Sequence, residues 1–323
     1  MRAFSFACLA IVGVVACSSG DRTVFAPSVD AGGSDVVGGG GDVGGDVRPV
    51  PIPTRDAGAQ DNCSEAARLV YVLSDRNELY SFRPNLRRFD RIGTLSCPTM
   101  MDPNSMAIDR DAVAWVNYVA PGALGDTAGA LYRVNTADAS CTAASPSSLP
   151  PRWFRLGMGF STTSADDTSE TLFITGTGSV LAGGSSGLGR FDIARGAVVP
   201  IGAFSGALRG QNAELTGTGD GRLFGFFTTT PVQVAQLDKQ SGAVIQSTPL
   251  PGVEAPETWA FSFWGGDFYL YTAPPRLFDP TRTSNVTRYR PSDGSIDTRY
   301  MENIGFRVVG AGVSTCAPIA PPP

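Results

Sequence analysis

One pattern of strand-forming residues recurs five times between residues 79 and 299. Each copy has a short β-type segment, a turn of small or polar residues and a second β-type segment. The copies align on one apolar position, occupied by Phe82, Val134, Phe191, Leu237 and Tyr289, with spacings of 52, 57, 46 and 52 residues. A repeat of this length, built from short strands, is typical of four-stranded sheets arranged radially.

Further apolar segments extend each copy to four strands. Every copy follows one such segment, and in four cases that segment follows another, at 105–109, 157–162, 213–218 and 259–264. The first copy lacks a leading strand, whereas residues 306–316 form a strand-like segment after the last copy. The sequence therefore predicts an all-β, five-bladed β-propeller over residues 61–318. We expect the C-terminal strand to pair into the first blade, because closing the ring removes exposed sheet edges.

Four cysteines lie within the predicted domain, and their positions are compatible with this closure. Cys316 ends the closing strand and Cys63 lies just before the first strand, so the two meet in a closed ring. We expect a Cys63–Cys316 disulfide, which leaves Cys97 to pair with Cys141 between the first two blades. Three pairings of four cysteines are formally possible. Stable disulfides are typical of exported proteins.

The N-terminal segment predicts export and a lipid anchor. In residues 1–16, Arg2 precedes a mostly apolar stretch of 14 residues, which is too short to cross a bilayer as a helix and typical of a signal peptide. The end of this stretch, Val-Val-Ala before Cys17, resembles a bacterial lipobox, in which the cysteine is acylated and becomes the mature N-terminus. We expect Cys17 to anchor the chain in a membrane, and Ser18 favours the outer membrane. The alternative is an ordinary secretory signal peptide.

Two further segments are predicted to be disordered. After Cys17, residues 18–60 contain 10 glycines and 6 aspartates and almost no aromatic side chain, so they bury too little apolar surface to offset the entropy lost on ordering. We therefore expect residues 17–60 to be a lipidated linker. Residues 319–323 are a Pro-rich stretch, predicted to be a disordered tail.

The chain contains no histidine. This excludes catalysis by Ser-His-Asp or Cys-His groups and zinc sites with histidine ligands. Lysine occurs once, at Lys239, the formal net charge is −5, and no basic run is interleaved with aromatic residues, which argues against a nucleic-acid partner. No metal or cofactor is predicted.

Carboxylates remain as candidate catalytic groups, because glycoside hydrolysis needs only a pair of them. The best-placed acids are Asp109 and Glu214, in predicted inner strands, and Asp220 and Asp267, at the starts of the following strands. Each of the last three also has a structural interpretation. We expect Glu214 to form an ion pair with an arginine, and Asp220 and Asp267 to be turn residues.

Two other groups of residues have a functional and a structural interpretation. Asp166 and Asp167 with Glu170 offer oxygen ligands for calcium, but the spacing is not that of an EF-hand and a solvated loop is favoured. The alternating aromatic residues at 259–263 offer a platform for a sugar ring, but packing between blades is favoured.

The segments 213–227, 259–274 and 305–318 resemble an uncharacterised exported lipoprotein family of myxobacteria and their relatives. The resemblance covers residues 63–318, and it implies the domain but no activity. We expect a non-enzymatic propeller that binds a ligand or an envelope protein at the cell envelope, with a membrane as partner through its N-terminal lipid. The alternatives are a carboxylate-dependent, glycan-acting hydrolase and a calcium-dependent hydrolase.

Overall fold

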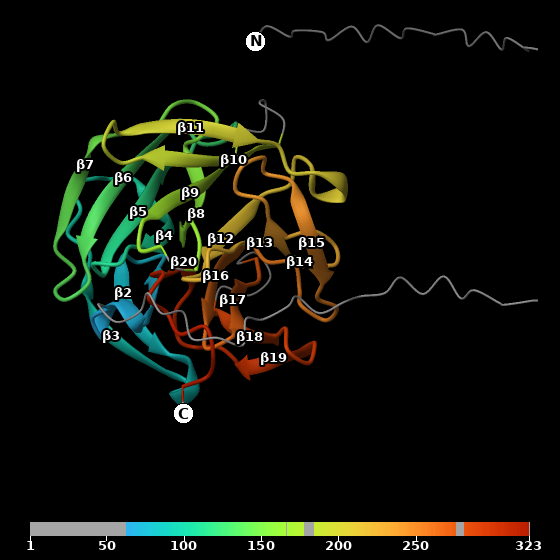
Figure 1. Ribbon diagram of the computed structural model, residues 1–323. Helices are drawn as coiled ribbons and strands as arrows, with labels where there is room; N and C mark the ends of the chain where they lie inside the picture. Colours follow the sequence, from blue (N-terminus) through green and yellow to red (C-terminus); the bar gives the residue numbers. More distant parts are fainter. Residues whose placement is uncertain (1–62, 166, 178–183, 276–280, 323) are drawn as a thin grey trace, which may run out of the picture. The chain divides into compact units, whose positions relative to one another are not determined.

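The computed structural model describes residues 63–165, 167–177, 184–275 and 281–322. The predicted signal peptide, Cys17 and the linker up to residue 60 lie outside these ranges. The described strands form five four-stranded antiparallel sheets, with the strand orders β20-β1-β2-β3, β4-β5-β6-β7, β8-β9-β10-β11, β12-β13-β14-β15 and β16-β17-β18-β19. The sheets surround a common axis, with the first strand of each order innermost (Figure 1). The predicted five-bladed propeller is therefore confirmed.

The strand bounds of the first two blades are β20 (Val308–Val313), β1 (Val70–Ser74), β2 (Glu78–Arg83), β3 (Arg88–Thr94), β4 (Asp102–Ile108), β5 (Val113–Ala120), β6 (Ala128–Asn135) and β7 (Cys141–Ser148). Blade three contains β8 (Arg155–Thr162), β9 (Glu170–Thr177), β10 (Ser185–Asp192) and β11 (Ala197–Gly202). Blades four and five contain β12 (Ala213–Gly217), β13 (Leu223–Phe227), β14 (Gln233–Leu237), β15 (Val244–Pro249), β16 (Thr258–Trp264), β17 (Asp267–Ala273), β18 (Asn285–Arg290) and β19 (Ser295–Met301). The described helices are short 3-10 turns, and none of them is long and apolar enough to cross a membrane.

The five aligned apolar residues of the sequence repeat occupy equivalent places in the structure. They lie in the third strand of each blade, and each has an exposed fraction of 4% or less. They are Phe82, Val134, Phe191, Leu237 and Tyr289. The repeat is thus a repeat of core positions, which follows from the alternation of side chains in a strand that is packed on one face.

The ring is closed as the sequence predicts. Strand β20 pairs antiparallel with β1, so that Val313 lies opposite Val70 and Ala311 opposite Val72. The disulfide Cys63–Cys316 joins the two ends, with 5.8 Å between the Cα atoms. The second predicted disulfide, Cys97–Cys141, is also present and joins the loop before β4 to the start of β7. Both pairings are confirmed, and two disulfides are typical of an oxidising, exported environment.

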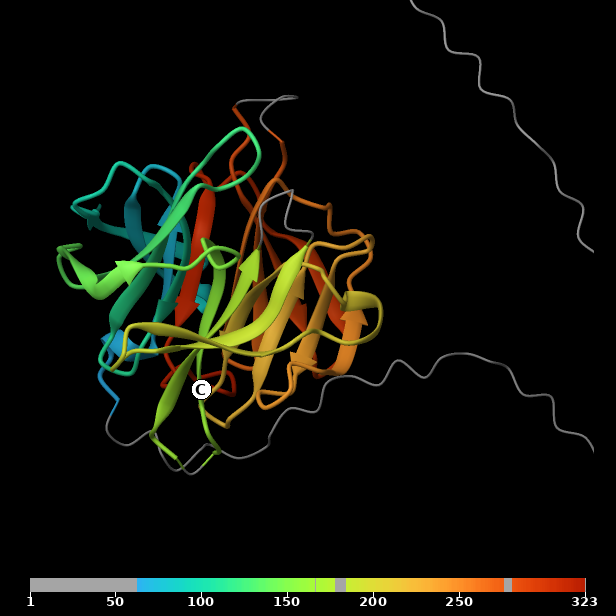
Figure 2. The same cartoon turned by 90° about the horizontal axis from the view of Figure 1, so that it is seen from above.

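The five innermost strands run in the same direction around the axis. Near their beginnings, the Asn104 side chain of β4 bonds to the Leu156 carbonyl of β8. Near their ends, the Thr162 hydroxyl of β8 bonds to the Gly219 carbonyl just after β12. One face of the propeller therefore carries the beginnings of all five inner strands, and we call it the start face. The opposite side, where these strands end, is called the end face (Figure 2).

Large aromatic side chains pack between neighbouring blades. Phe261 and Phe263 of β16 are buried with Phe224 and Phe226 of β13 in one core cluster. This confirms the predicted packing role for two of the three alternating aromatic residues. Ile319 belongs to the same cluster and is 1% exposed, so the packed chain continues past residue 318, where the sequence places the beginning of a disordered tail.

Candidate functional site

A pocket lies on the axis at the start face, where all five blades meet. Its volume is about 70 Å³, enough for several water molecules or a small polar group. The lining residues are Pro103, Asn104, Arg155, Leu156, Gly157, Thr177, Asn212, Ala213, Glu214, Glu257, Thr258, Trp259 and Val309. We call it the axial pocket.

Glu214 provides the buried carboxyl group of the axial pocket. It alternates in β12 with Ala213 and Leu215, which pack into the core between blades three and four. The period of two residues in a strand therefore turns Glu214 away from that core. Its Oε2 accepts a hydrogen bond of 2.8 Å from the Ser105 hydroxyl of β4. Glu214 is 5% exposed.

Burial raises the pKa of Glu214 well above its usual value, while the Ser105 hydroxyl, the Met158 backbone amide and the Arg155 guanidinium act in the opposite direction. The ion pair with an arginine that the sequence predicts is not formed with any described residue. Arg155 instead holds Asp126, at 2.8 and 3.0 Å. Burial thus favours the protonated form of Glu214, and a protonated carboxyl group can both donate and accept a hydrogen bond.

The wall of the axial pocket next to Glu214 is a connected polar network. Arg155 binds Asp126 through two nitrogens and donates a third hydrogen bond to Asn104 Oδ1. The Asn104 amide donates to Asn117 Oδ1 at 2.9 Å, and Asn117 in turn bonds to the backbone of Phe154 and Leu156. Because these side chains serve as hydrogen-bond donors and acceptors for one another, the network holds this wall of the pocket in one arrangement.

Three polar atoms of the lining residues have no such partner. Asn212 Oδ1, Thr258 Oγ1 and Trp259 Nε1 are buried and make no hydrogen bond within the described part of the chain. Leaving a buried polar atom unpaired costs about 1–3 kcal/mol, so their grouping around one pocket requires an explanation. Asn212 offers an acceptor, the Thr258 hydroxyl both a donor and an acceptor, and Trp259 a donor, and a ligand rich in hydroxyl groups suits this set.

The structure separates Glu214 from the other three predicted acids. Asp109, Asp220 and Asp267 follow the ends of inner strands, at the end face, whereas Glu214 lies at the start face. Asp109 accepts hydrogen bonds from the backbone of Asp111 and Val113 and from Trp115 Nε1, and burial raises its pKa. These contacts organise the turn between β4 and β5.

Asp220 and Asp267 are held by arginines. Asp220 pairs with Arg222 at 2.9 Å and accepts from the Thr218 hydroxyl, within the turn that the sequence predicts. Asp267 starts β17 and pairs with Arg288. Burial raises the pKa of Asp267, and the arginine opposes this effect. Both arrangements fit structural ion pairs.

Sequence reasoning missed most of the axial pocket. Glu257 is exposed, lines the pocket and accepts a hydrogen bond of 2.8 Å from Arg307 Nη2. Asn104, Arg155 and Asn212 were also not predicted. A usable signal was available: these residues stand at or just before the beginnings of aligned inner strands, so a closed ring places them around one end of the axis. Trp259, the third alternating aromatic residue, also lines this pocket.

A half-buried acid, Glu170, lies at the end face. Its Oε1 accepts from the Arg110 backbone amide at 2.7 Å, and its Oε2 accepts from the Thr315 hydroxyl at 2.9 Å. Burial raises the pKa of Glu170 to about 7. In the calcium hypothesis Glu170 joins Asp167, but the Asp167 carboxylate binds the Ser169 amide in an exposed turn. Asp166 lies outside the described residues, and the described chain contains no group of three or more His, Cys, Asp or Glu residues suited to a metal ion.

Comparison with known proteins finds no matching protein family and no matching curated protein. Among solved structures, a gluconolactonase of Xanthomonas campestris has a TM-score of 0.38 and 15% identity, covering 63% of this chain and 68% of its own. A luciferin-regenerating enzyme has a TM-score of 0.43 and 12% identity, covering 77% of this chain and 92% of its own. At these low scores, neither likeness indicates what this chain binds.

Proposed function

We propose that this chain is an exported lipoprotein, anchored through Cys17, whose propeller binds a small, neutral, hydroxyl-rich ligand in the axial pocket without transforming it. The observation that carries the binding role is that the buried Glu214 lines one pocket together with Asn212, Thr258 and Trp259, three residues that each have a buried polar atom without a hydrogen-bond partner in the described part of the chain. The two disulfides and the lipobox-like sequence support the exported location.

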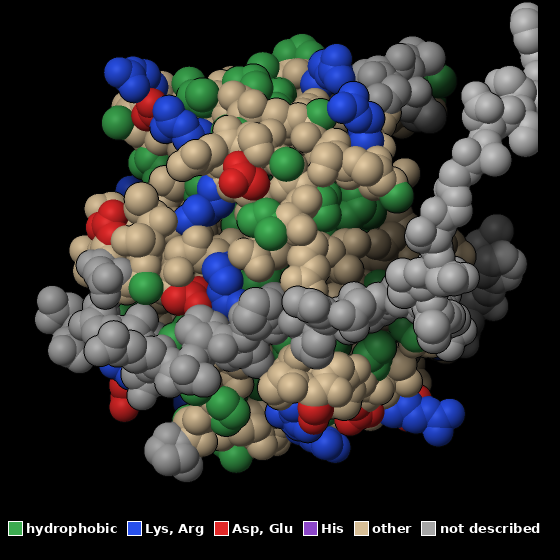
Figure 3. All heavy atoms as spheres, turned by 45° about the vertical axis from the view of Figure 1, so that its right-hand side comes forward, with side chains coloured by type: hydrophobic (Ala, Val, Ile, Leu, Met, Phe, Trp, Pro, Cys, Tyr) green, Lys and Arg blue, Asp and Glu red, His purple; other side chains and the backbone are tan. Residues whose placement is uncertain are grey.

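The charges around the axial pocket favour an uncharged ligand. Arg155, which lines the pocket, binds Asp126, and Arg307 binds the lining residue Glu257, so both cations have carboxylate partners. An anion would therefore meet no unpaired positive charge there, and it would oppose ionisation of Glu214. On the face shown in Figure 3, the basic and acidic side chains drawn in colour are interspersed. That surface therefore provides no strong field for steering a charged ligand.

The binding role is tested by calorimetry on the mature domain with monosaccharides and polyols, beside carboxylates and amines of similar size. Sugars or polyols are expected to bind, and Glu214→Leu to weaken that binding at least tenfold, because it removes both hydrogen-bonding functions of the acid. Glu214→Gln keeps both functions and is expected to retain binding at neutral pH. Asp111→Asn, which changes an exposed carboxylate at the end face, is the matched control. Binding confined to the anions would contradict the proposal.

A hydrolase using the same pocket is the second candidate. Burial raises the pKa of Glu214, whereas Glu257 accepts a hydrogen bond from Arg307, and both residues line the axial pocket. Cleavage of a glycoside requires two carboxyl groups that flank the scissile bond. Release of reducing ends from a glycan, lost in both Glu214→Gln and Glu257→Gln, would favour this candidate over simple binding.

The anchor is tested separately from the pocket. Cys17→Ser is expected to move the protein from the membrane fraction to the soluble fraction and to abolish incorporation of labelled fatty acid. Cys8→Ser, which changes the other cysteine of the N-terminal segment, is the control and should leave both unchanged. Unaltered fractionation of Cys17→Ser would contradict the lipoprotein assignment.

A further inference from the structure

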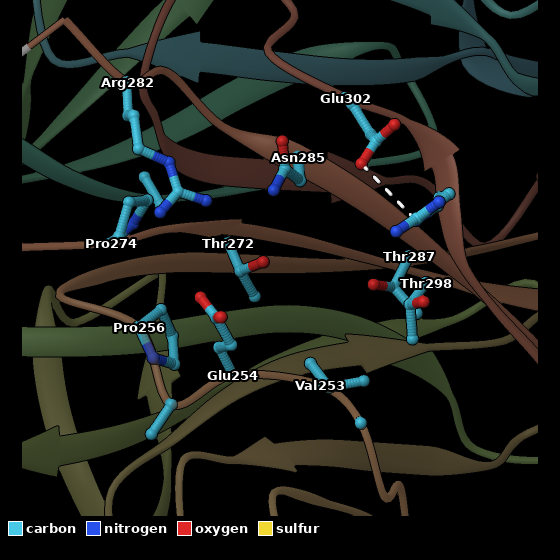
Figure 4. A pocket seen from close by; sticks show the side chains of 14 residues that line it. Val253, Glu254, Pro256, Thr272, Pro274, Arg282, Asn285, Thr287, Thr298 and Glu302 are labelled. Carbon is cyan, nitrogen blue, oxygen red and sulfur yellow. Dashed lines mark ion pairs between the residues drawn. The ribbon is translucent and has the colours of Figure 1, made fainter.

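A polar crevice of about 260 Å³ opens at the start face beside blade five. Threonine and asparagine side chains from β17, β18 and β19 form its floor, and the segment 252–256 forms its other wall (Figure 4). The labelled Thr272, Asn285, Thr287 and Thr298 lie together within this view.

The crevice results from a change of polarity along one face of a sheet. Phe268 lies opposite Tyr289, and both are buried against blade four. Further toward the start face, Leu270 lies opposite Thr287, and then Thr272 lies opposite Asn285. The core between blades four and five therefore ends where the paired positions become polar. A face that needed only to pack would continue with apolar residues.

The hydroxyl groups of this floor are free to bind. Thr272, Thr287 and Thr298 make no side-chain hydrogen bond with any residue in the described ranges. Thr287 is only 3% exposed, although it lines the crevice. Such hydroxyls can each donate one hydrogen bond and accept others.

Charged residues of both signs stand at the rim. Glu254 and Arg282 point toward the centre of the crevice from opposite walls, while Arg299 and Glu302 form an ion pair at 3.8 Å (Figure 4). The two positive and two negative side chains cancel in sum. The rim therefore carries no net charge that would favour an anion or a cation. Its hydrogen-bond donors and acceptors, together with the threonine hydroxyls of the floor, suit a neutral sugar unit.

The crevice and the axial pocket are neighbours on the start face. Glu254 lines the crevice and Glu257 lines the axial pocket, and three residues of extended chain span at most about 11 Å. The Glu257 amide donates to the carbonyl of Ala273, which lines the crevice. Arg307 binds Glu257 and also the carbonyl of Pro274 in the crevice wall. A single ridge thus separates the two cavities.

We propose that the crevice is a second subsite, and that the ligand is a neutral oligosaccharide that lies across this ridge, with the hydroxyl-bearing edge of one unit in the axial pocket and a following unit on the threonine floor. This inference rests on the proposed binding function of the axial pocket. The expected ligand is therefore a chain of sugar units, not a single small molecule.

The test is calorimetry with two ladders of probes, glucose and its β-1,4-linked oligomers of two to six units, and N-acetylglucosamine with its corresponding oligomers. In at least one ladder, affinity is expected to rise at least tenfold from the monomer to the trimer or tetramer. The double variant Thr287→Val/Thr298→Val should reduce the affinity for the long members to that for the monomer and leave monomer binding unchanged. Thr142→Val, an exposed hydroxyl in the outer strand of blade two, is the control.

The outcomes separate the two proposals. Monomer binding that Glu214→Leu abolishes, without any rise along the ladder, overturns the second subsite and leaves the axial function standing. A rise along the ladder that survives the double threonine substitution also overturns the subsite. No binding by any member of either ladder overturns the oligosaccharide proposal, and no binding by any monosaccharide or polyol overturns the axial function as well. Length-dependent binding of a neutral peptide series, with none for the sugars, overturns the oligosaccharide assignment.

Discussion

Ser105 and Glu214 meet across the axis of the propeller, where the hydroxyl of one donates to the carboxyl group of the other at 2.8 Å. Ser105 belongs to blade two and Glu214 to blade four, and blade three stands between them in the ring. This bond joins two non-adjacent blades directly, and both residues are buried. The buried acid of the axial pocket is therefore held in place by a residue from across the ring.

Stability is expected to fall as the pH rises through neutrality, because of Glu170. Its folded pKa of about 7 lies above its ordinary value of 4.5. The native state therefore holds a proton that the unfolded state releases, and this contribution is complete below about pH 4.5 and lost as the pH passes 7. The shift corresponds to about 3 kcal/mol at most. Urea unfolding at pH 5 and pH 8 measures it.

Substitution separates this effect from other titrations. Glu170→Gln should flatten the dependence between pH 5 and pH 8 and leave the protein more stable than the wild type at pH 8. Asp167→Asn, an exposed carboxylate close in sequence, should leave the wild-type dependence intact. An equally steep profile in Glu170→Gln would show that Glu170 is not responsible.

Loss of the closing disulfide is expected to destabilise the ring more than loss of the second one. The bond Cys63–Cys316 closes a separation of 253 residues, against 44 for Cys97–Cys141. In the chain-entropy account these contribute about 5 and about 4 kcal/mol. Double alanine variants compared by denaturant unfolding give the difference. Hydrogen exchange should rise in β20 and β1 only in the first variant, and similar exchange in both variants would argue that strand pairing alone closes the ring.

Close approach of the inner strands makes Gly157 intolerant of a side chain. A Cβ atom there would lie 1.9 Å from the carbonyl oxygen of Ala213, so β8 and β12 would have to separate. Gly157→Ala is expected to lower the free energy of unfolding by about 1–3 kcal/mol or more. Gly159→Ala in the same strand meets its nearest atom at 3.0 Å and should cost less. Thermal unfolding ranks the two, and the reverse order would contradict the packing described.

The single lysine of the chain joins two blades. Lys239 Nζ, from the turn after β14, donates to the Thr162 carbonyl at 2.6 Å and to the Thr163 carbonyl at 3.2 Å, beyond the end of β8. Lys239→Met keeps much of the side-chain volume but leaves the buried Thr162 carbonyl without this donor. A loss of about 1–3 kcal/mol is expected. Gln240→Met, at the neighbouring position, is the control, and equal stability of the two variants would contradict an inter-blade role.

Much of the architecture was predictable, because a propeller repeats its core positions along the chain. The aligned residues from Phe82 to Tyr289 gave the blade count, and the unmatched strand at 306–316 gave the closure. The cysteine pairings followed from the closure. Each of these inferences depends on strand alternation and on the repeat, which a linear sequence displays directly, and the pairing of the end strands follows from closing the ring.

The binding site was not predictable in the same way. The sequence placed Asp109 and Glu214 together as inner-strand acids, but a strand has two ends, and the fold puts these residues at opposite faces. Whether Glu214 forms an ion pair with an arginine or a hydrogen bond with a hydroxyl depends on blades far apart in the sequence. In the structure its partner is the Ser105 hydroxyl. The sequence alone determined the repeat, the closure and the absence of histidine chemistry. Only the tertiary structure decided which polar groups share a pocket, because that depends on distances across the axis between residues that no local pattern relates.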